Sequence, residues 1–419
     1  MLLWIFLVLL VGKALFQVYL SWRNLRYAQA HSQILPVFKD LITKEDFEKS
    51  KNYLRDNTIF GFIVKSFDLV FNLVFVFILY PYIERVVVSL TDSFILQGLF
   101  FFGIFGLINL ILSIPFDIYE TFVLEEKYGF NTTTPKIFIL DIIKSIIISI
   151  ILGAPLLAFL LYLIKVDPNF WWKFALTLIF FELFIYFIYP LVIAPLFNKF
   201  TPLEEGELKD KIVEIAEKVG FKISNVFVMD ASRRTKKQNA YLTGFGKSRR
   251  VVLYDTILSY PQDEILAIFA HELGHHRRGH LPKLLALSVL FYVLYIYSTF
   301  LVYKNASLSR YFGIQKEFTL LVYAFIFTSS LFYFINPFVN AISRKFEYEA
   351  DAFSARILRN PYPLINALKR LVKENLSNIY PDPLFRTWYY SHPAPSERIY
   401  ALLSLEKGEN KDEDNDSSN

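Results

Sequence analysis

Seven long apolar stretches dominate this sequence and decide what the chain can fold into. They cover residues 2–20, 60–82, 94–114, 137–163, 173–193, 281–303 and 318–342. A helix needs about 20 mostly apolar residues to cross a bilayer, and each stretch reaches or nearly reaches that length. Only 20% of the residues are charged, whereas soluble proteins average about 25%. The sequence therefore predicts a multi-pass α-helical membrane protein with seven transmembrane helices.

The basic residues predict how these helices are oriented. Seven crossings place the two ends of the chain on opposite sides of the membrane. The side of the amino terminus carries 6 of the 44 Lys and Arg residues, and the other side carries 34. Because cytoplasmic loops are enriched in Lys and Arg, we expect the amino terminus outside or in a lumen and the large polar regions in the cytoplasm. The first apolar run lacks a small-residue cleavage site, so we expect an uncleaved anchor.

Polar segments divide the chain into five regions. We expect five transmembrane helices in 1–193, a cytoplasmic α/β region in 194–280, two more transmembrane helices in 281–342, a C-terminal helical region in 343–405 and a disordered acidic tail in 406–419. The membrane would be the inner membrane of a bacterial cell or the endoplasmic reticulum of a eukaryotic one.

Periodicity inside the α/β region predicts its elements. We expect a helix over 208–219, followed by strands over 225–230, 238–243 and 250–254. The glycines Gly244 and Gly246, with Lys247 and Ser248, indicate a hairpin between the last two strands. A further helix is expected to begin near Pro261, with Ser259 and Gln262 as a capping box, and to continue to Gly279.

The strongest chemical signal is the run His271-Glu272-Leu273-Gly274-His275. Histidines at positions i and i+4 share one helical face, so both rings can reach one metal ion. Glu272 is rotated by about 100° from His271, toward the place of an attacking water. Zinc lowers the pKa of such a water to about 7, and a neighbouring carboxylate can then take its proton. The motif predicts a zinc peptidase centre with Glu272 as general base.

A third ligand must come from another part of the chain, which has no Cys. Glu347 and Asp351 are spaced i, i+4, and the last two transmembrane stretches form a hairpin that returns them to the side of the motif. We expect Glu347 to bind the metal and Asp351 to orient a ligand histidine. Glu349 is the rival ligand, and a solvated run of charges beside the membrane is the alternative without a metal.

Two further groups of polar residues leave alternatives open. His276 and His280 form a second i, i+4 pair without the following Glu, so we expect them behind the ligands or at an interface. Ionisable residues inside the apolar stretches either neutralise one another locally or line a polar cavity. The pairs concerned are Lys65 with Asp68 and Asp141 with Lys144.

These motifs together resemble the integral-membrane CAAX prenyl protease type 1 family, zinc endopeptidases that process prenylated proteins. Similar stretches are also found at 121–131, at 194–203 and at Ser391-His392-Pro393 with Glu397-Arg398. The resemblance implies seven tilted helices around an intramembrane chamber, with a zincin-like metal site at its cytoplasmic end. It also implies that Glu347, and not Glu349, is the third zinc ligand.

The same resemblance implies roles for residues that their own pattern does not single out. By similarity, His392 hydrogen-bonds the oxyanion that develops beside zinc. Asn239, Ala240 and Tyr241 would form an edge strand along which an extended substrate pairs, with Asn239 on the substrate backbone. Arg398 would support Glu347 or the loop that carries His392.

The sequence thus predicts a membrane-embedded metalloendopeptidase that binds one Zn²⁺ and cleaves near the C-terminus of peptides, prenylated or not. A broader quality-control zinc protease and a zinc-binding transporter or channel are the alternatives, although a transporter has no need of Glu272. The expected partners are a peptide or protein substrate and the lipid bilayer. The net charge of +5 is scattered, so no nucleic-acid partner is expected.

Overall fold

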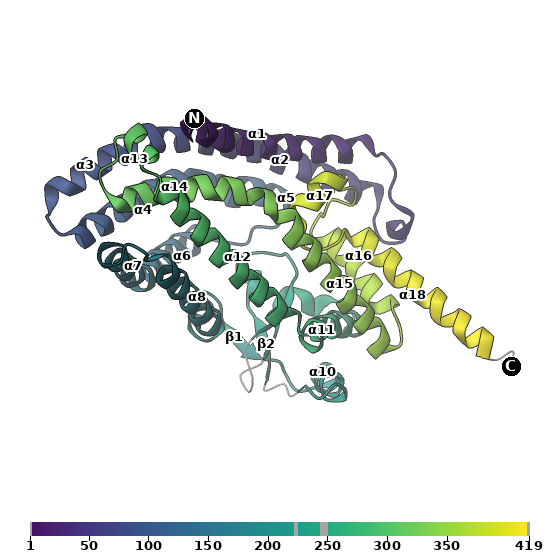
Figure 1. The fold of residues 1–419 in the computed structure, drawn as a ribbon. Helices are drawn as coiled ribbons and strands as arrows, with labels where there is room; N and C mark the ends of the chain where they lie inside the picture. The colour runs from purple at the N-terminus through teal and green to yellow at the C-terminus, as the bar shows by residue number, and fades with distance from the viewer. Residues whose placement is uncertain (1, 222–224, 244–249, 417–419) are drawn as a thin grey trace.

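The computed structural model describes residues 2–221, 225–243 and 250–416 (Figure 1). Within this part of the chain, seven helices are long and apolar enough to cross a membrane, which confirms the prediction. They are Leu3–Ala30, Lys44–Leu90, Phe94–Tyr128, Pro135–Val166, Trp171–Phe197, His280–Tyr303 and Glu317–Leu358.

Short π-helical turns interrupt four of these helices. The helical segments of the first five spans are α1 (Leu2–Ala30), α2 (Lys44–Val74), α3 (Tyr80–Leu90), α4 (Phe94–Tyr119), α5 (Glu126–Tyr128), α6 (Pro135–Ile148), α7 (Ala154–Val166), α8 (Trp171–Ile188) and α9 (Ala194–Phe197). Three of the π turns come just before Pro81, Pro155 and Pro195. Because proline clashes with the carbonyl four residues earlier, a wider turn lets the helix continue past it.

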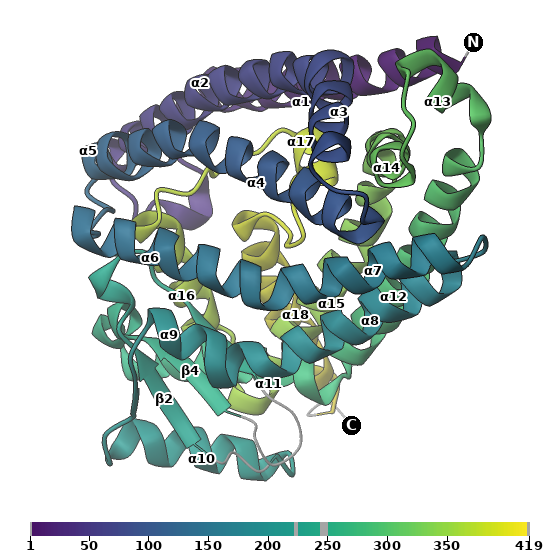
Figure 2. The same ribbon diagram turned by 90° about the vertical axis from the view of Figure 1, so that its left-hand side faces the viewer.

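The long helices form an open arrangement and not a tight bundle (Figure 2). In six of the seven spans, 17% or less of the most apolar window is buried inside the structure. Asp68 lines a cavity of about 240 Å³ between α2 and α4, together with Asn109 and Asp117. Asp141 lines a second cavity, of about 910 Å³, and it also pairs with Lys144 and accepts two hydrogen bonds from Arg234. The membrane part is therefore the chamber-like helical assembly that was expected. Both alternatives for its charged residues are found, since Asp68 lines a cavity and Asp141 forms an ion pair with Lys144.

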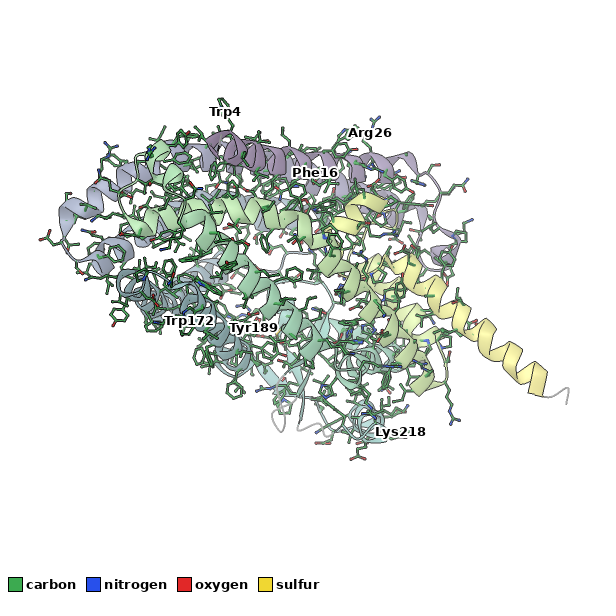
Figure 3. The ribbon with its side chains drawn as sticks, in the orientation of Figure 1. Trp4, Phe16, Arg26, Trp172, Tyr189 and Lys218 are labelled. Carbon is green, nitrogen blue, oxygen red and sulfur yellow. The ribbon has the colours of Figure 1, made fainter. Side chains whose placement is uncertain are left out.

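The outer surface of this assembly is apolar. Figure 3 shows Trp4 projecting away from α1 and Trp172 on α8, and their exposed fractions are 70% and 46%. Lys218, on α10 (Glu207–Lys218), lies at the far edge of the polar part of the molecule. Large exposed apolar side chains at one end and charges at the other fit a protein whose helices face lipid.

The polar part of the chain contains a four-stranded sheet. Its strands are β1 (Phe200–Pro202), β2 (Asn225–Met229), β3 (Ala240–Thr243) and β4 (Arg250–Tyr254). Their order is β1-β2-β4-β3, with β2 and β4 parallel and the outer pairings antiparallel. The expected helix is α10, and the expected strands are β2, β3 and β4. The predicted hairpin at 244–248 lies outside the described residues.

In the described part of the chain, eight α-helices follow the sheet, and the first of them, α11, packs against it. They are α11 (Gln262–Arg277), α12 (His280–Tyr303), α13 (Ala306–Phe312), α14 (Glu317–Phe332), α15 (Asn336–Leu358), α16 (Tyr362–Glu374), α17 (Pro383–Tyr389) and α18 (Pro395–Asp416). Ile265, Phe269 and Leu273 of α11 are buried against the sheet and α10 in one apolar core. This burial fixes the helix that carries the histidine motif.

Four sequence predictions differ from the structure in detail. No capping box begins α11, because the Ser259 hydroxyl donates to the Thr256 carbonyl and Pro261 is the N-cap. The helix ends at Arg277, since Gly279 adopts a left-handed φ of 65° and starts α12 in a new direction. The boundary drawn at 343 falls inside α15, which is continuous. The tail that was expected to be disordered belongs to helix α18 as far as Asp416.

Candidate metal centre

Close packing of α11 on α15 brings the histidine motif to the carboxylates. Gly274 makes this possible, because a Cβ at that position would lie 3.1 Å from the Cα of Ala350. The buried Ser354 hydroxyl donates to the Ala267 carbonyl at 2.8 Å and ties the two helices together. Arg370 of α16 holds the first turn of α11 through two hydrogen bonds to Glu264, at 2.8 and 2.9 Å.

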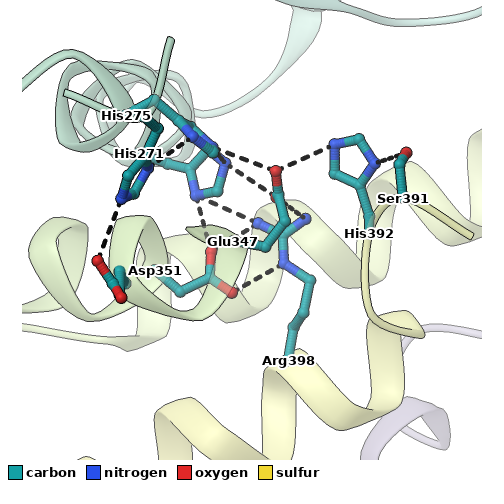
Figure 4. Close-up of polar contacts among 9 residues, drawn as sticks. His271, His275, Glu347, Asp351, Ser391, His392 and Arg398 are labelled. Carbon is teal, nitrogen blue, oxygen red and sulfur yellow. Dashed lines mark hydrogen bonds and ion pairs between the residues drawn. The ribbon is translucent and has the colours of Figure 1, made fainter. Parts of the chain in front are cut away.

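His271, His275 and Glu347 converge at this junction (Figure 4). The Nε2 atoms of His271 and His275 are 3.2 Å apart. Glu347 Oε2 lies 3.4 Å from the Nε2 of His271, and Glu347 Oε1 lies 3.2 Å from the Nε2 of His275. Two ligand atoms about 2.0–2.1 Å from one zinc ion in a tetrahedral site are roughly 3.3–3.4 Å apart. The separation of the two Nε2 atoms, and that of each from its nearer Glu347 oxygen, are close to this value, and one atom from each residue lies within 4.8 Å of the others, so the three side chains can hold one zinc ion together.

The carboxylate of Glu347 gives a second reason to infer a cation. Its side chain is only 5% exposed, and Oε2 has no hydrogen-bond partner among the described residues. A buried carboxylate oxygen without a partner is costly, and a metal ion between it and the two imidazoles would satisfy it. The donor set of two imidazoles and one carboxylate is one that zinc accepts in catalytic sites.

Asp351 and Arg398 hold His271 in the orientation that a metal requires. Asp351 Oδ1 lies 2.8 Å from the Nδ1 of His271, which leaves Nε2 free for the metal. Arg398, from α18, donates to both oxygens of Asp351 at 2.8 and 2.6 Å, and its Nη1 lies 3.7 Å from Glu347 Oε2. Figure 4 shows this chain of contacts running from α18 through α15 to α11.

The rival ligand Glu349 points away from this group. Its carboxylate lies 3.1 Å from the Nε2 of His280, and it is not part of the group of three ligand atoms. The ring of His276 packs edge-on against Phe221, with centroids 4.5 Å apart. Thus His280 lies behind the metal group, whereas His276 lies at the contact with the α/β core.

Glu272 and His392 lie beside the three candidate ligands. Burial raises the pKa of Glu272, whose carboxyl also interacts electrostatically with His271 and His275. His392, on the loop before α18, places its Nε2 3.3 Å from Glu347 Oε1. Its ring is 61% exposed, yet the surrounding protein desolvates it enough to lower its pKa. A neutral ring that accepts from Ser391 at Nδ1, at 2.9 Å, presents Nε2–H to the site.

The expected substrate strand borders the same helix. Ala240 and Tyr241 lie in β3, which pairs with β4 on one side and has no second neighbouring strand among the described residues. Asn239 comes directly before β3, and its carbonyl accepts a hydrogen bond from the Tyr254 amide at 3.1 Å. Its own side-chain oxygen accepts from the Ala240 amide at 2.9 Å.

Sequence reasoning did not single out two contributions to this centre. Ser391 had no role beyond its place in the Ser-His-Pro run, where adjacency to His392 was the available signal. The pairing of His280 with Glu349 had no local signal, because a helix break and a membrane hairpin separate the two residues.

Family comparisons agree with this architecture along the chain. A model described as CAAX prenyl protease N-terminal, five membrane helices, matches residues 24–199. A model of peptidase family M48 matches residues 202–406.

Individual relatives match over nearly their whole length. The chain is 36% identical to CAAX prenyl protease 1 of Saccharomyces cerevisiae, over 92% of each protein. It is 34% identical to CAAX prenyl protease 1 homolog of Arabidopsis thaliana, over 94% of this chain and 95% of that one. A crystal structure of S. mikatae Ste24p superposes with a TM-score of 0.89 at 34% identity, covering 95% of this chain and 98% of that one.

Proposed function

This chain belongs to peptidase family M48, among the membrane-embedded CAAX prenyl proteases, and from that premise we propose how its residues carry out the reaction. His271, His275 and Glu347 bind one Zn²⁺, and the enzyme hydrolyses peptide bonds near the C-terminus of prenylated substrates. The observation that carries the proposal is the convergence of the three side chains: the two Nε2 atoms lie 3.2 Å apart, and each lies 3.2–3.4 Å from an oxygen of Glu347.

Glu272 is proposed to move the proton that hydrolysis requires. A zinc ion held by the three ligands would polarise the scissile carbonyl and acidify the attacking water. Glu272 takes one proton from that water as its oxygen bonds to the carbonyl carbon, and then gives it to the leaving amine nitrogen as the C–N bond breaks. Burial raises the pKa of Glu272, which brings it closer to the pKa of the water and favours transfer in both directions.

His392 is proposed to stabilise the negative charge that develops on the carbonyl oxygen. Its Nε2 faces the ligand group from the side opposite α11, as Figure 4 shows. A donor in this position strengthens its interaction as the charge grows, so it lowers the barrier more than it tightens substrate binding. Asp351 and Arg398 act through His271 and hold its ring during turnover.

The open edge of β3 is proposed to bind the peptide part of the substrate. Backbone groups on the free side of Ala240 and Tyr241 can pair with an extended peptide, as in other complexes formed by strand addition. Because β3 packs beside α11, a peptide bound along this edge would run past Glu272. Asn239, at the start of the strand, is placed to contact the peptide backbone.

An apolar cleft beside α15, the helix that carries Glu347, supports prenyl recognition. It has a volume of about 440 Å³ and lies between α12 and the start of α15, lined by residues such as Leu284, Phe291 and Val339. Val339 precedes Glu347 by eight residues, which is about 12 Å along a helix. A prenyl chain gains little free energy on moving from lipid to such a cleft, because both are apolar. The cleft would therefore orient the chain and the peptide bond attached to it.

Mass spectrometry of cleavage products tests the function directly. We expect purified enzyme to cleave a farnesylated CAAX peptide and to leave the matched unprenylated peptide largely intact. The Glu272→Gln enzyme is the control for a contaminating protease. Equal cleavage of both peptides would favour a broader quality-control protease, and zinc binding without cleavage of either peptide would refute the proposal.

Helices α11 and α15 carry the proposed ligands. We propose that the metal site they form lies on the cytoplasmic side of the membrane, which carries most of the basic residues. The absence of Cys makes this testable with single-cysteine variants. Glu217 on α10 and Asp92 in the loop between α3 and α4 are both exposed. In sealed membrane vesicles with the cytoplasmic face outward, a membrane-impermeant maleimide should label Glu217→Cys and not Asp92→Cys, and the reverse pattern would overturn the orientation.

A further inference from the structure

A third histidine lies directly behind the ligand His275. His280 is the first residue of α12 and is 1% exposed. Its Nδ1 lies 3.1 Å from the Nδ1 of His275, and its Nε2 lies 3.1 Å from Glu349 Oε2. The ring stacks on Phe346, with centroids 4.3 Å apart and planes 4° from parallel. Both nitrogens and the ring face of His280 are therefore occupied by specific contacts.

If His275 binds a metal, the two hydrogen bonds among His275, His280 and Glu349 can have only one donor-to-acceptor direction. If the Nε2 of His275 binds a metal, the proton of its neutral ring is on Nδ1. That N–H then donates to the Nδ1 of His280, which must be unprotonated. The proton of the His280 ring is consequently on Nε2, where it donates to the carboxylate of Glu349.

We propose that His280 and Glu349 are positioning residues for the ligand His275. The proposal rests on the proposed metal site and adds two residues to the parts that hold it. With these two residues, each ligand histidine has a carboxylate behind its Nδ1. Asp351 contacts the Nδ1 of His271 directly at 2.8 Å, and Glu349 reaches the Nδ1 of His275 through His280. Helix α15 thus supplies the ligand Glu347 and both supporting carboxylates.

Helix geometry explains why one support is direct and the other needs an intermediary. Glu349 and Asp351 are two residues apart, so their side chains leave α15 about 200° from each other. Asp351 faces α11 and reaches His271. Glu349 faces α12, and His280 carries its contact back to His275. The left-handed Gly279 makes this possible, because the turn it forms places His280 beside the last turn of α11.

Zinc affinity is the measurement that separates a positioning role from a purely structural one. The dissociation constant would be measured by competition with a chromophoric chelator, and Co²⁺ absorption would report the geometry of the ligands. His280→Phe keeps an aromatic ring for Phe346 and removes both nitrogens, whereas Glu349→Ala removes the acceptor. Loss of such supporting groups costs about 10–100-fold in metal affinity, so we expect both variants to weaken zinc binding by about that factor and to alter the Co²⁺ spectrum.

Two further variants test the direction of the chain of hydrogen bonds. Glu349→Gln retains an oxygen that can accept from the Nε2–H of His280, so we expect it to bind zinc more tightly than Glu349→Ala. Because Glu349 acts through His280, the double variant of His280→Phe with Glu349→Ala should bind zinc as His280→Phe alone does. Arg356→Ala, at an exposed position on the same helix, should match the unmodified enzyme.

The outcomes separate this inference from the proposed function. If the unmodified enzyme binds no zinc, the proposed metal site itself is wrong. If it binds zinc and His280→Phe has the same affinity and Co²⁺ spectrum, the positioning role is refuted. Complete loss of zinc in Glu349→Ala would make Glu349 a ligand and also overturn the inference. Should His280→Phe fail to fold, the comparison of Glu349→Ala with Glu349→Gln still decides, because the Glu349 side chain is 32% exposed.

Discussion

Replacement of Gly274 by Ala tests whether the spacing of α11 and α15 determines metal binding. A Cβ at this position would lie 3.1 Å from both the Cα of Ala350 and the Cβ of Phe353, and 3.2 Å from the Ala350 carbonyl oxygen. Carbon atoms in contact prefer about 3.5–4.0 Å, so the helices must separate by roughly 0.4–0.9 Å. Two of the three clashes are with backbone atoms, which no rotamer change can relieve.

The expected effect follows from comparing two opposing magnitudes. Alanine favours a helix over glycine by about 1 kcal/mol, whereas overpacking a tight contact costs about 1–3 kcal/mol. The net change in folding stability is therefore small, about 0–2 kcal/mol of destabilisation. Metal distances tolerate only about ±0.2 Å, so the same separation should weaken zinc binding by about tenfold or more. Zinc affinity should therefore change more clearly than the free energy of unfolding.

Chelator competition for zinc and thermal unfolding of the metal-free protein measure the two effects separately. Gly103→Ala is the matched control, because Gly103 also lies inside a helix, α4, and a Cβ there meets nothing within 4 Å. We expect this control to retain its zinc affinity. A Gly274→Ala enzyme with zinc affinity and turnover within twofold of the unmodified protein would refute the reasoning from helix spacing.

Three further predictions concern the side chains of the centre. Glu347→Ala should lose zinc as measured by metal analysis, and retention of zinc in that variant would show that the ligand assignment is wrong. Glu272→Gln should keep zinc and lose about 10²–10⁴ in rate, because the amide cannot accept the proton of the water; near-normal turnover would contradict its role as base. His392→Ala should keep zinc and lose about 10²–10³ in kcat with a much smaller change in KM. A rise in KM alone would make His392 a residue of substrate binding.

Much of the fold could be predicted from the sequence because its signals are local. Apolar runs of sufficient length specify the seven spans, and the i, i+4 spacing of His271 and His275 places both rings on one face of α11. The strand over 250–254 coincides with β4, because its apolar residues and flanking turn residues agree. The predicted cap of α11 was wrong, because a helix cap and a preceding turn compete for the same side chain. Ser259 could not cap α11, because a preceding 3₁₀ turn had already engaged its hydroxyl.

The contacts that hold the candidate site could not be predicted from periodicity. Glu347 and Glu349 are both carboxylates within one helical turn, and the pattern alone left the choice between them open. The structure distinguishes them because His280 stands between Glu349 and the metal group. That placement depends on the turn at Gly279 and on the return of α15 through the membrane. Both are long-range consequences of the helix arrangement.

Helices α12 and α15 connect the metal centre to the membrane, and this connection bears on the preference for prenylated substrates. Helix α12 begins at His280, behind the ligands, and α15 carries Glu347. The apolar cleft is lined by α12 from Leu284 to Tyr295 and by the first turns of α15. In the proposed complex, the distance from prenyl site to metal is therefore set by rigid helices and not by a loop. Lipid and cleft are equally apolar, so binding of the prenyl chain contributes mainly orientation of the attached peptide bond. Discrimination between prenylated and unprenylated peptides should then appear in kcat at least as strongly as in KM.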